Sequence, residues 1–319
     1  MLYSNLMEVN MEELKNFLAE KTPAEAWKAL LTPPAKYAFE HKTELVQVYK
    51  YNDFSAELYL QNNGPGTVQQ VLKVVPAKLN GKAPAVVVPF YYPEAVLGFE
   101  LDTLEEIPRF SPVAILNHLV QRGYIAITAE AYHLTYLQSD LDRLEWKRWR
   151  NAGEALTADY PQWSGVGKLV ADTRLLVDEL LNDVRVDAGK IGIAGHSLGG
   201  KMAFYTGCMD ERIKVILASD FGFNWNCTNW HDVWYWGDKL HVMQELNLEH
   251  HQLLDLAGGK PFMLLAGEAD NAASYEAMQK SSVYKDHPEY LQIIDHATGH
   301  RPPQHVLEAG YDFLDKFLR

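Results

Sequence analysis

The stretch Gly195-His196-Ser197-Leu198-Gly199-Gly200 decides the fold prediction. It follows a short apolar run, Ile191–Ala194, that is typical of a buried strand, and it precedes a helical stretch. A serine in such a strand-to-helix turn takes a strained backbone conformation, which neighbours without bulky side chains permit. The turn lifts the Ser197 hydroxyl above the sheet and points the Leu198 N–H toward a developing oxyanion. The stretch therefore predicts a nucleophile, rather than a glycine-rich turn that only packs a helix on a strand.

Apolar runs alternate with helical patterns on both sides of this stretch. From residue 83 onward the expected strands are Ala85–Val88, Tyr124–Thr128, Ile191–Ala194, Val215–Ala218, Pro261–Leu265 and Tyr290–Ile294. Helices are expected from Ser111, over Leu169–Leu181, from Leu198 and from Pro302. A period of two predicts earlier, antiparallel strands at Leu45–Lys50, Ala56–Gln61 and Val68–Val75. The expected class is α/β, a mostly parallel central sheet with antiparallel N-terminal strands and helices on both faces.

Two segments are too long for ordinary connections between these elements. Residues 131–166 and 221–260 hold seven of the eight tryptophans, and inserts of this length are often functional lids. We interpret both as insertions that form a cap. Residues 1–43 are predicted to be a helical N-terminal extension with helix N-caps at Asn10 and Thr22. No repeat or linker divides the chain, so residues 1–319 are expected to form a single domain.

A serine nucleophile needs a base that a third group orients. In folds of this kind the chain order is serine, acid, histidine, with the acid just past a later strand and the histidine after the last strand. Asp270 is the expected acid, Asp220 is its competitor one strand earlier, and Glu268 is a third candidate. His300 is the expected general base, because it follows a glycine in the loop before the last helix.

The oxyanion of the reaction needs two N–H donors. The Leu198 N–H at the start of a helix is the first expected donor. The second should come from the loop after Ala85–Val88. Pro89 has no N–H to give, so Phe90 or Tyr91 is the candidate.

Aromatic side chains near the expected site suggest a substrate pocket. The candidate pocket residues are Tyr92, His196, Trp225, Trp230 and Trp234. Flat rings in the 221–260 insertion could stack on a sugar. The alternative is that these rings pack against the core, as large rings usually do.

Charge and residue spacing argue against several classes of binding partner and cofactor. The formal net charge of −13 argues against nucleic acid and against an anionic membrane surface. No spacing of histidines and cysteines predicts a metal, and no glycine-rich motif after a strand predicts a nucleotide, so no cofactor is expected. Two cysteines, Cys208 and Cys227, and an N-terminus without a signal sequence favour a cytoplasmic location. The sequence leaves the oligomeric state open, a homo-oligomer included.

The motifs together resemble a known superfamily. Residues from about 83 to 319 are similar to α/β-hydrolases, near the dienelactone-hydrolase-like and acetyl-xylan-esterase-like serine hydrolases. The matching pieces are Trp163-Ser164-Gly165 with Asp172, Val186–Ile191, Gly195–Gly200, Gly267–Asp270 and Gly299-His300. The resemblance implies a carboxylesterase for small-molecule or carbohydrate esters that needs no cofactor. Dienelactone hydrolases proper use a cysteine nucleophile where this chain has Ser197.

Two alternatives to the esterase stand beside it. A serine peptidase or amidase could use the same triad, although the segment before the sheet core is short for the extra domain that sieves peptides. A non-catalytic binding protein could keep the fold without the chemistry, although the complete serine, acid and histidine order argues against it.

Overall fold

The N-terminal helices pack against distant parts of the chain. The computed structural model describes residues 11–319, so the N-cap predicted at Asn10 lies outside the described residues. Helix α1 spans Met11–Ala19 and α2 spans Pro23–Leu31. The Thr22 hydroxyl accepts a hydrogen bond from the Glu25 N–H, and the Glu25 carboxylate accepts one from the Thr22 N–H at 2.9 Å. The N-cap predicted at Thr22 is therefore confirmed, as a reciprocal capping box.

The described residues form a nine-stranded sheet with the order β1-β2-β3-β5-β4-β6-β7-β8-β9. The strands are β1 Thr43–Lys50, β2 Phe54–Gly64, β3 Thr67–Pro76, β4 Ala83–Val87, β5 Ile125–Ala129, β6 Val186–His196, β7 Ile213–Ser219, β8 Phe262–Ala266 and β9 Leu291–Asp295. Strands β1 to β3 pair antiparallel, β3 joins β5 antiparallel, and every pair from β5 to β9 is parallel. The predicted α/β class, with its antiparallel opening, is confirmed.

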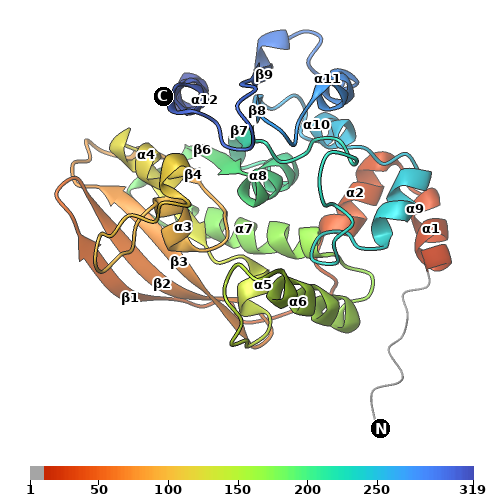
Figure 1. The fold of residues 1–319 in the computed structure, drawn as a ribbon, viewed down its shortest axis with the longest axis horizontal. Helices are drawn as coiled ribbons and strands as arrows, with labels where there is room; N and C mark the ends of the chain where they lie inside the picture. Colours follow the sequence, from red (N-terminus) through yellow and green to blue (C-terminus); the bar gives the residue numbers. More distant parts are fainter. Residues whose placement is uncertain (1–10) are drawn as a thin grey trace.

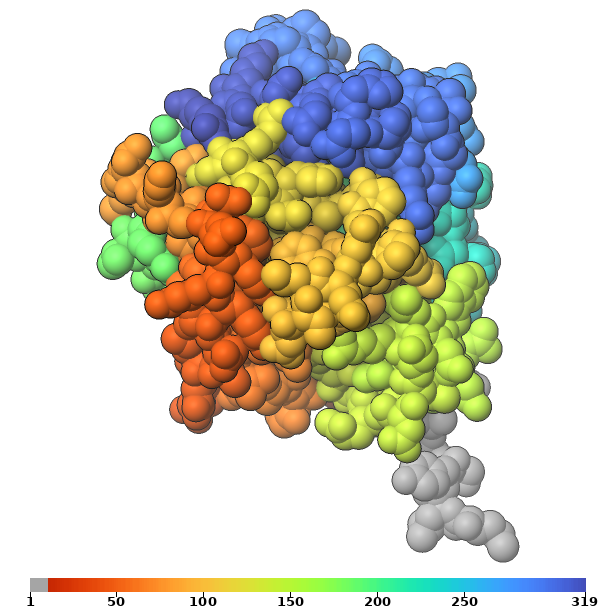
Figure 2. All heavy atoms as spheres, turned by 60° about the vertical axis from the view of Figure 1, so that its left-hand side comes forward, coloured from red at the N-terminus to blue at the C-terminus, as the bar shows by residue number. Residues whose placement is uncertain are grey.

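Helices cover both faces of the sheet. Their bounds are α3 Pro93–Leu97, α4 Ile115–Gln121, α5 Tyr132–Thr135, α6 Trp146–Asp159, α7 Gly165–Leu181, α8 Leu198–Met209, α9 Lys239–Glu245, α10 His251–Leu256, α11 Ala272–Gln279 and α12 Gln304–Leu318, with single 3₁₀ turns at Ser111–Val113 and Pro288–Tyr290. Helices α7 and α8 pack on one face, and α4 and α12 pack on the other. Figure 2 shows the segment around α3 and α4, in yellow, between the orange N-terminal strands and the blue C-terminal part.

Strand β4 shows why the central strands read as continuous apolar runs. Ala85 and Val87 pack in the core beneath α7, whereas Val86 and Val88 pack in the core beneath α4 and α12. Successive side chains of a strand point to opposite faces, so a strand covered on both sides must be apolar at every position.

The two long inserts carry helices of their own. Residues 131–166 contain α5 and α6, and residues 221–260 contain α9 and α10. Helix α1 contacts α9, and α2 contacts α10 and α7, so the N-terminal extension lies beside the second insert (Figure 1). Trp27 of α2 is fully buried and stacks on Trp225 of that insert, with ring centroids 6.2 Å apart. In residues 11–319, no helix is long and apolar enough to cross a membrane.

Candidate active site

Ser197 lies in the sharp turn between β6 and α8. Its backbone angles, φ 56° and ψ −118°, are strained for a residue with a side chain. The Ser197 N–H donates to the Ser219 carbonyl of β7 at 2.8 Å. A Cβ on Gly195 would stand 2.1 Å from the Gly199 carbonyl oxygen, and a Cβ on Gly199 would stand 2.2 Å from the Pro89 oxygen. Glycine at both positions is therefore what allows the turn to close.

His300 contacts Ser197 from the loop between β9 and α12. The Ser197 hydroxyl lies 2.9 Å from His300 Nε2, and His300 Nδ1 lies 2.6 Å from the Asp220 carboxylate. With its proton on Nδ1, the imidazole donates to Asp220 and accepts from Ser197. The His300 side chain is 38% exposed, whereas the Asp220 side chain is fully buried. The His300 imidazole is thus partly accessible to solvent, whereas its carboxylate partner is not.

Asp220 directly follows β7 in a left-handed backbone conformation, with φ 43°. Its N–H donates to the Leu265 carbonyl at 2.8 Å. One carboxylate oxygen accepts from the Gly267 N–H at 2.8 Å and from the Ala269 N–H at 2.9 Å, which leaves the other oxygen for His300. Backbone donors therefore fix the orientation of this acid.

The expectation that Asp270 orients His300 does not match the structure, which places Asp220 there. Asp270 is buried, and its carboxylate accepts from the N–H groups of Phe221 and Gly222 at 3.0 Å and of Phe223 at 2.6 Å. The Ser274 hydroxyl also donates to it, at 2.8 Å. Burial raises the pKa of Asp270, and these donors oppose the rise. Four donors turn Asp270 toward the segment after Asp220 and away from the imidazole.

Glu268 does not contact the imidazole either. Within residues 11–319, the only carboxylate that His300 bonds is that of Asp220. The third candidate acid is therefore also misplaced, and the competitor is the residue that the fold brings to the histidine.

His196 packs against the ring of His300 instead of lining a pocket. Its ring centroid lies 4.6 Å from that of His300, and its Nδ1 lies 3.0 Å from the Ser219 hydroxyl. The side chain is buried, and burial holds its pKa well below the ordinary value. A neutral, buried ring at this position supports His300 but offers no surface to a substrate, which corrects the pocket prediction for His196.

The loop after β4 lies against the start of α8, where the second oxyanion donor was expected. The carbonyl of Tyr91 accepts from the Ala131 N–H at 3.0 Å, which fixes the loop. The N–H groups of Phe90 and Tyr91 have no acceptor in the described part of the chain. Burial raises the pKa of the Tyr91 phenol, and Arg109 and the Ser197 hydroxyl oppose that rise. Tyr91 thus lies at the nucleophile, and the roles of Leu198, Phe90 and Tyr91 as donors stay predictions.

The tryptophans of the second insert are packed side chains. Trp230 and Trp234 are 0% and 1% exposed. The Trp230 Nε1–H donates to the Gly222 carbonyl at 2.8 Å, and the half-buried Trp225 donates to the Leu248 carbonyl at 2.9 Å. Trp230 and Trp234 therefore cannot stack on a sugar in this structure, which corrects that prediction.

Tyr92, on the loop between β4 and α3, is partly exposed. The guanidinium of Arg143 lies 4.8 Å from the ring centroid, within range of a cation–π contact. Of the candidate pocket residues, Tyr92 and Trp225 are the two that remain partly accessible.

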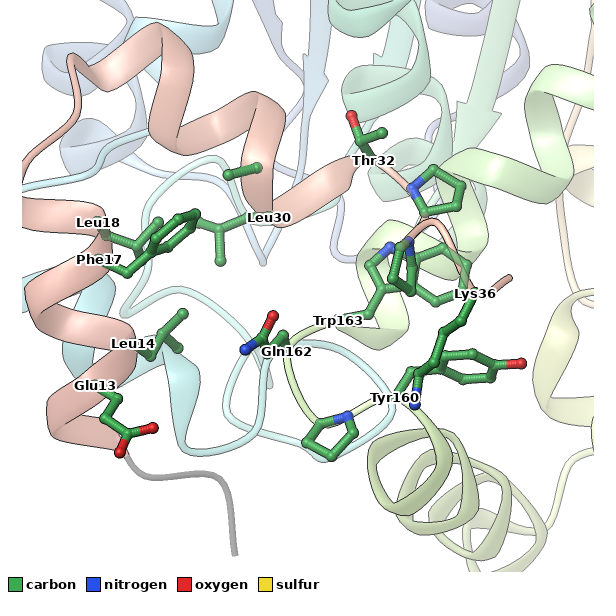
Figure 3. Close-up of a pocket in the computed structure, with 14 residues that line it drawn as sticks. Glu13, Leu14, Phe17, Leu18, Leu30, Thr32, Lys36, Tyr160, Gln162 and Trp163 are labelled. Carbon is green, nitrogen blue, oxygen red and sulfur yellow. The ribbon is translucent and has the colours of Figure 1, made fainter. Parts of the chain in front are cut away.

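A separate cavity of about 830 Å³ does not include Ser197, His300 or Asp220 in its lining (Figure 3). Leu14, Phe17 and Leu18 of α1 face it from one side, and Trp163 faces it from the other. This cavity is therefore separate from the hydrogen-bonded group of Ser197, His300 and Asp220.

No cluster of three or more metal-binding side chains occurs among residues 11–319. Hydrogen bonds connect the Ser197 hydroxyl to the His300 imidazole and the imidazole to the Asp220 carboxylate. This arrangement can activate an oxygen nucleophile by proton transfer.

Comparison with known proteins assigns the chain to a family. The model of the dienelactone hydrolase family matches residues 74–293, which is more than half of the chain. The chain belongs to the dienelactone hydrolase family. No curated protein sequence matches it.

Solved structures similar to this dienelactone hydrolase family member share its fold at low identity. A putative acetyl xylan esterase from Bacteroides fragilis is 15% identical with a TM-score of 0.67, over 92% of this chain and 78% of its own. A glucuronoyl esterase from Solibacter usitatus is 14% identical with a TM-score of 0.66, over 94% and 91%. An acetyl xylan esterase from Paenibacillus sp. R4 is 16% identical with a TM-score of 0.57, and the match covers 100% of both chains. The α/β-hydrolase fold is thereby confirmed.

Proposed function

We propose that this member of the dienelactone hydrolase family is a serine esterase that cleaves a small-molecule or carbohydrate ester through an acyl-enzyme on Ser197. The observation that carries the proposal is the chain of two hydrogen bonds from Ser197 through His300 to Asp220, at 2.9 and 2.6 Å. Membership of a hydrolase family and the esterases among the structural neighbours support it.

The first half of the reaction forms the acyl-enzyme. Ser197 Oγ attacks the ester carbonyl carbon while His300 Nε2 takes the hydroxyl proton. The carbonyl oxygen becomes an oxyanion beside the Leu198 N–H and the N–H of Phe90 or Tyr91. Collapse of this intermediate breaks the bond to the alcohol, whose oxygen receives the proton from His300.

The second half releases the acid. A water molecule gives a proton to His300 Nε2 and attacks the acyl carbon, and Ser197 leaves with that proton. Asp220 keeps the imidazole in the tautomer that can accept a proton, and its charge stabilises the imidazolium that forms twice per cycle. The Gly267 and Ala269 N–H bonds hold the carboxylate in place throughout.

The substrate class is proposed from the structural neighbours and from the aromatic rings that remain partly exposed. Neighbours described as acetyl xylan and glucuronoyl esterases favour an ester on a carbohydrate. Tyr92 is one of the two partly exposed rings, with Trp225, that remain as candidates for a sugar contact, and it contacts Arg143 of the first insert, which we propose as part of a cap. No observation favours a peptidase or a binding protein over the esterase.

A cytoplasmic location is also part of the proposal. Cys208 is buried, Cys227 is half-buried, and neither forms a disulfide, as is usual in a reducing compartment. Fractionation of cells that produce the protein naturally would test this, and recovery in the secreted fraction would contradict it.

A panel of esters tests the proposed activity. Acetylated xylo-oligosaccharides, methyl esters of uronic acids, p-nitrophenyl acetate and an aminoacyl anilide would be compared between the natural protein and Ser197→Ala. We expect hydrolysis of at least one ester by the natural protein and a loss of about 10⁴-fold or more in kcat for Ser197→Ala. Hydrolysis of the anilide alone would favour the amidase, and folded protein that is inactive on every substrate would overturn the proposal.

A further inference from the structure

The turn after Asp220 consists of Phe221, Gly222 and Phe223. Every backbone N–H and carbonyl group of this turn forms a hydrogen bond with a side chain. The N–H groups of Phe221, Gly222 and Phe223 all donate to the Asp270 carboxylate, at 3.0, 3.0 and 2.6 Å. A single carboxylate thus accepts from three consecutive residues.

The three carbonyls of the same turn meet three different donors. Lys201 Nζ donates to the Phe221 carbonyl at 2.8 Å, and the Trp230 Nε1–H donates to the Gly222 carbonyl at 2.8 Å. The Nδ1–H of His250 donates to the Phe223 carbonyl at 2.6 Å. Because these side chains come from α8 and from the long insert after β7, the turn is fixed from several directions.

The holding side chains are buried and support one another. Asp270, Lys201 and His250 are each less than 5% exposed. The Lys201 ammonium lies 3.7 Å from the centroid of the Trp230 ring, and the His250 Nε2 accepts from the Tyr205 hydroxyl at 2.5 Å. Two ionisable side chains, Asp270 and Lys201, buried on one short turn cost desolvation energy that apolar side chains would avoid. A turn that served only to connect β7 to the insert would not need them.

The position of Asp220 explains what the turn requires. Asp220 has φ 43°, in the left-handed backbone region that residues other than glycine rarely adopt. The turn of Phe221–Phe223 begins at the next residue. A rotation of the Phe221 peptide would turn the Asp220 carboxylate away from the imidazole. Its distance of 2.6 Å to His300 Nδ1 therefore depends on the geometry of the residues that follow it.

We propose that Asp270 is a positioning residue, which acts with Lys201, Trp230 and His250 to hold the turn that aims Asp220 at His300. This inference rests on the proposed function, because it gives Asp270 a role in positioning the proposed triad of Ser197, His300 and Asp220. Asp270 itself does not contact the reacting atoms. Asp220 acts on His300 by direct contact, whereas Asp270 acts through the backbone of Phe221–Phe223.

Asp270→Asn tests the proposal directly. The amide keeps the shape of the side chain but can accept hydrogen bonds at only one of its two ends, so the turn loses at least one bond. We expect kcat on p-nitrophenyl acetate to fall about 10- to 100-fold, as for a catalytic group displaced by a fraction of an ångström to one ångström. KM should stay within about twofold, because ground-state binding is not touched.

A spectroscopic signal separates positioning from stability. In ¹H NMR the proton shared by His300 Nδ1 and Asp220 resonates far downfield, and it can be observed without substrate. Asp270→Asn should move this signal upfield or broaden it away. Asp172→Asn is the matched control, since Asp172 is also buried and hydrogen-bonded, to Lys168 and to Asn63, but does not contact the triad. It should lower the melting temperature and leave the signal and kcat unchanged.

The outcomes are distinct. A lowered melting temperature with kcat and the downfield signal intact in Asp270→Asn would overturn the proposal, and so would a loss of kcat with the signal unchanged. If Asp270→Asn does not fold, Trp230→Phe decides, because it removes one donor to the turn and keeps a ring over Lys201; an unchanged signal there overturns the proposal. An inactive natural protein that shows the signal would contradict the proposed function and not the positioning.

Discussion

Two buried aspartates follow neighbouring strands, Asp220 after β7 and Asp270 after β8, and only one of them reaches the histidine. Asp220 receives backbone N–H bonds from the turn after β8, and Asp270 receives them from the turn after β7. The Asp220 carboxylate therefore orders the turn after β8, and the Asp270 carboxylate orders the turn after β7. The difference is that Asp220 keeps one oxygen free for His300, whereas both oxygens of Asp270 are occupied by the protein.

The position of a carboxylate along the chain does not by itself define its function. What separates an orienting acid from a structural one is which acceptor sites remain after the backbone has been satisfied. Four donors surround Asp270, from Phe221, Gly222, Phe223 and Ser274, so its negative charge is balanced inside the turn.

The largest effect that separates the two aspartates is expected from Asp220→Asn. Loss of this charge removes the stabilisation of the imidazolium and favours the wrong tautomer, at a cost in kcat of up to ~10⁴-fold. Steady-state kinetics on the best ester of the panel would measure it. The loss should exceed that of Asp270→Asn, and a reversed ranking would show that Asp270 orients the base in solution.

The next largest effect is expected on stability, from a tryptophan in the second insert, residues 221–260. Trp234→Ala should destabilise the fold by about 3–5 kcal/mol, as for other large rings removed from a core, because Trp234 is almost completely buried. Urea unfolding would measure the loss. The ratio of kcat/KM for an acetylated sugar to that for p-nitrophenyl acetate should not change, and a selective loss on the sugar would show that Trp234 does reach the substrate.

A pH dependence of stability is expected from Lys201. Burial lowers its pKa to about 7, from an ordinary value near 10.5. Between these values the unfolded chain binds the proton and the folded protein does not, so the stability of the natural protein rises with pH relative to Lys201→Met. The slope is at most about 1.4 kcal/mol per pH unit.

Urea unfolding of both proteins from pH 6.5 to pH 9.5 would show this relative gain. Below pH 7 both states of Lys201 are protonated, so the difference between the two proteins should become constant there. A difference that stays flat over the whole range would mean that Lys201 is not held in the apolar setting seen in the structure.

The smallest effect is expected at the edge of the same network. Ser274→Ala removes one of the four donors to Asp270 and leaves the three backbone bonds in place. Loss of one such bond to a charged group should cost about 1.5–3 kcal/mol of stability. We expect kcat to change by less than about threefold, which kinetics at matched folding would check.

The sequence was sufficient to predict the sheet and to predict that Ser197 and His300 come together. Buried strands such as β4 and β5 are continuous apolar runs, and the elbow at Ser197 and the loop at His300 lie where strands end. These features depend on local pattern, which a sequence displays directly.

The acid and the pocket could not be predicted because they depend on contacts between distant residues. Asp220 and Asp270 both follow apolar strands, and the donors that distinguish them lie 47 to 49 positions away along the chain. The rings of Trp230 and Trp234 look alike whether they face a ligand or the core.

The rate at which a fluorophosphonate labels the protein tests the central claim most directly. The triad of Ser197, His300 and Asp220 predicts a single adduct, located on Ser197 by peptide mass spectrometry and absent from Ser197→Ala. It also predicts the fastest labelling in the natural protein, slower labelling in Asp270→Asn and the slowest in Asp220→Asn. An adduct on another residue, or labelling of Asp220→Asn as fast as that of the natural protein, would contradict it.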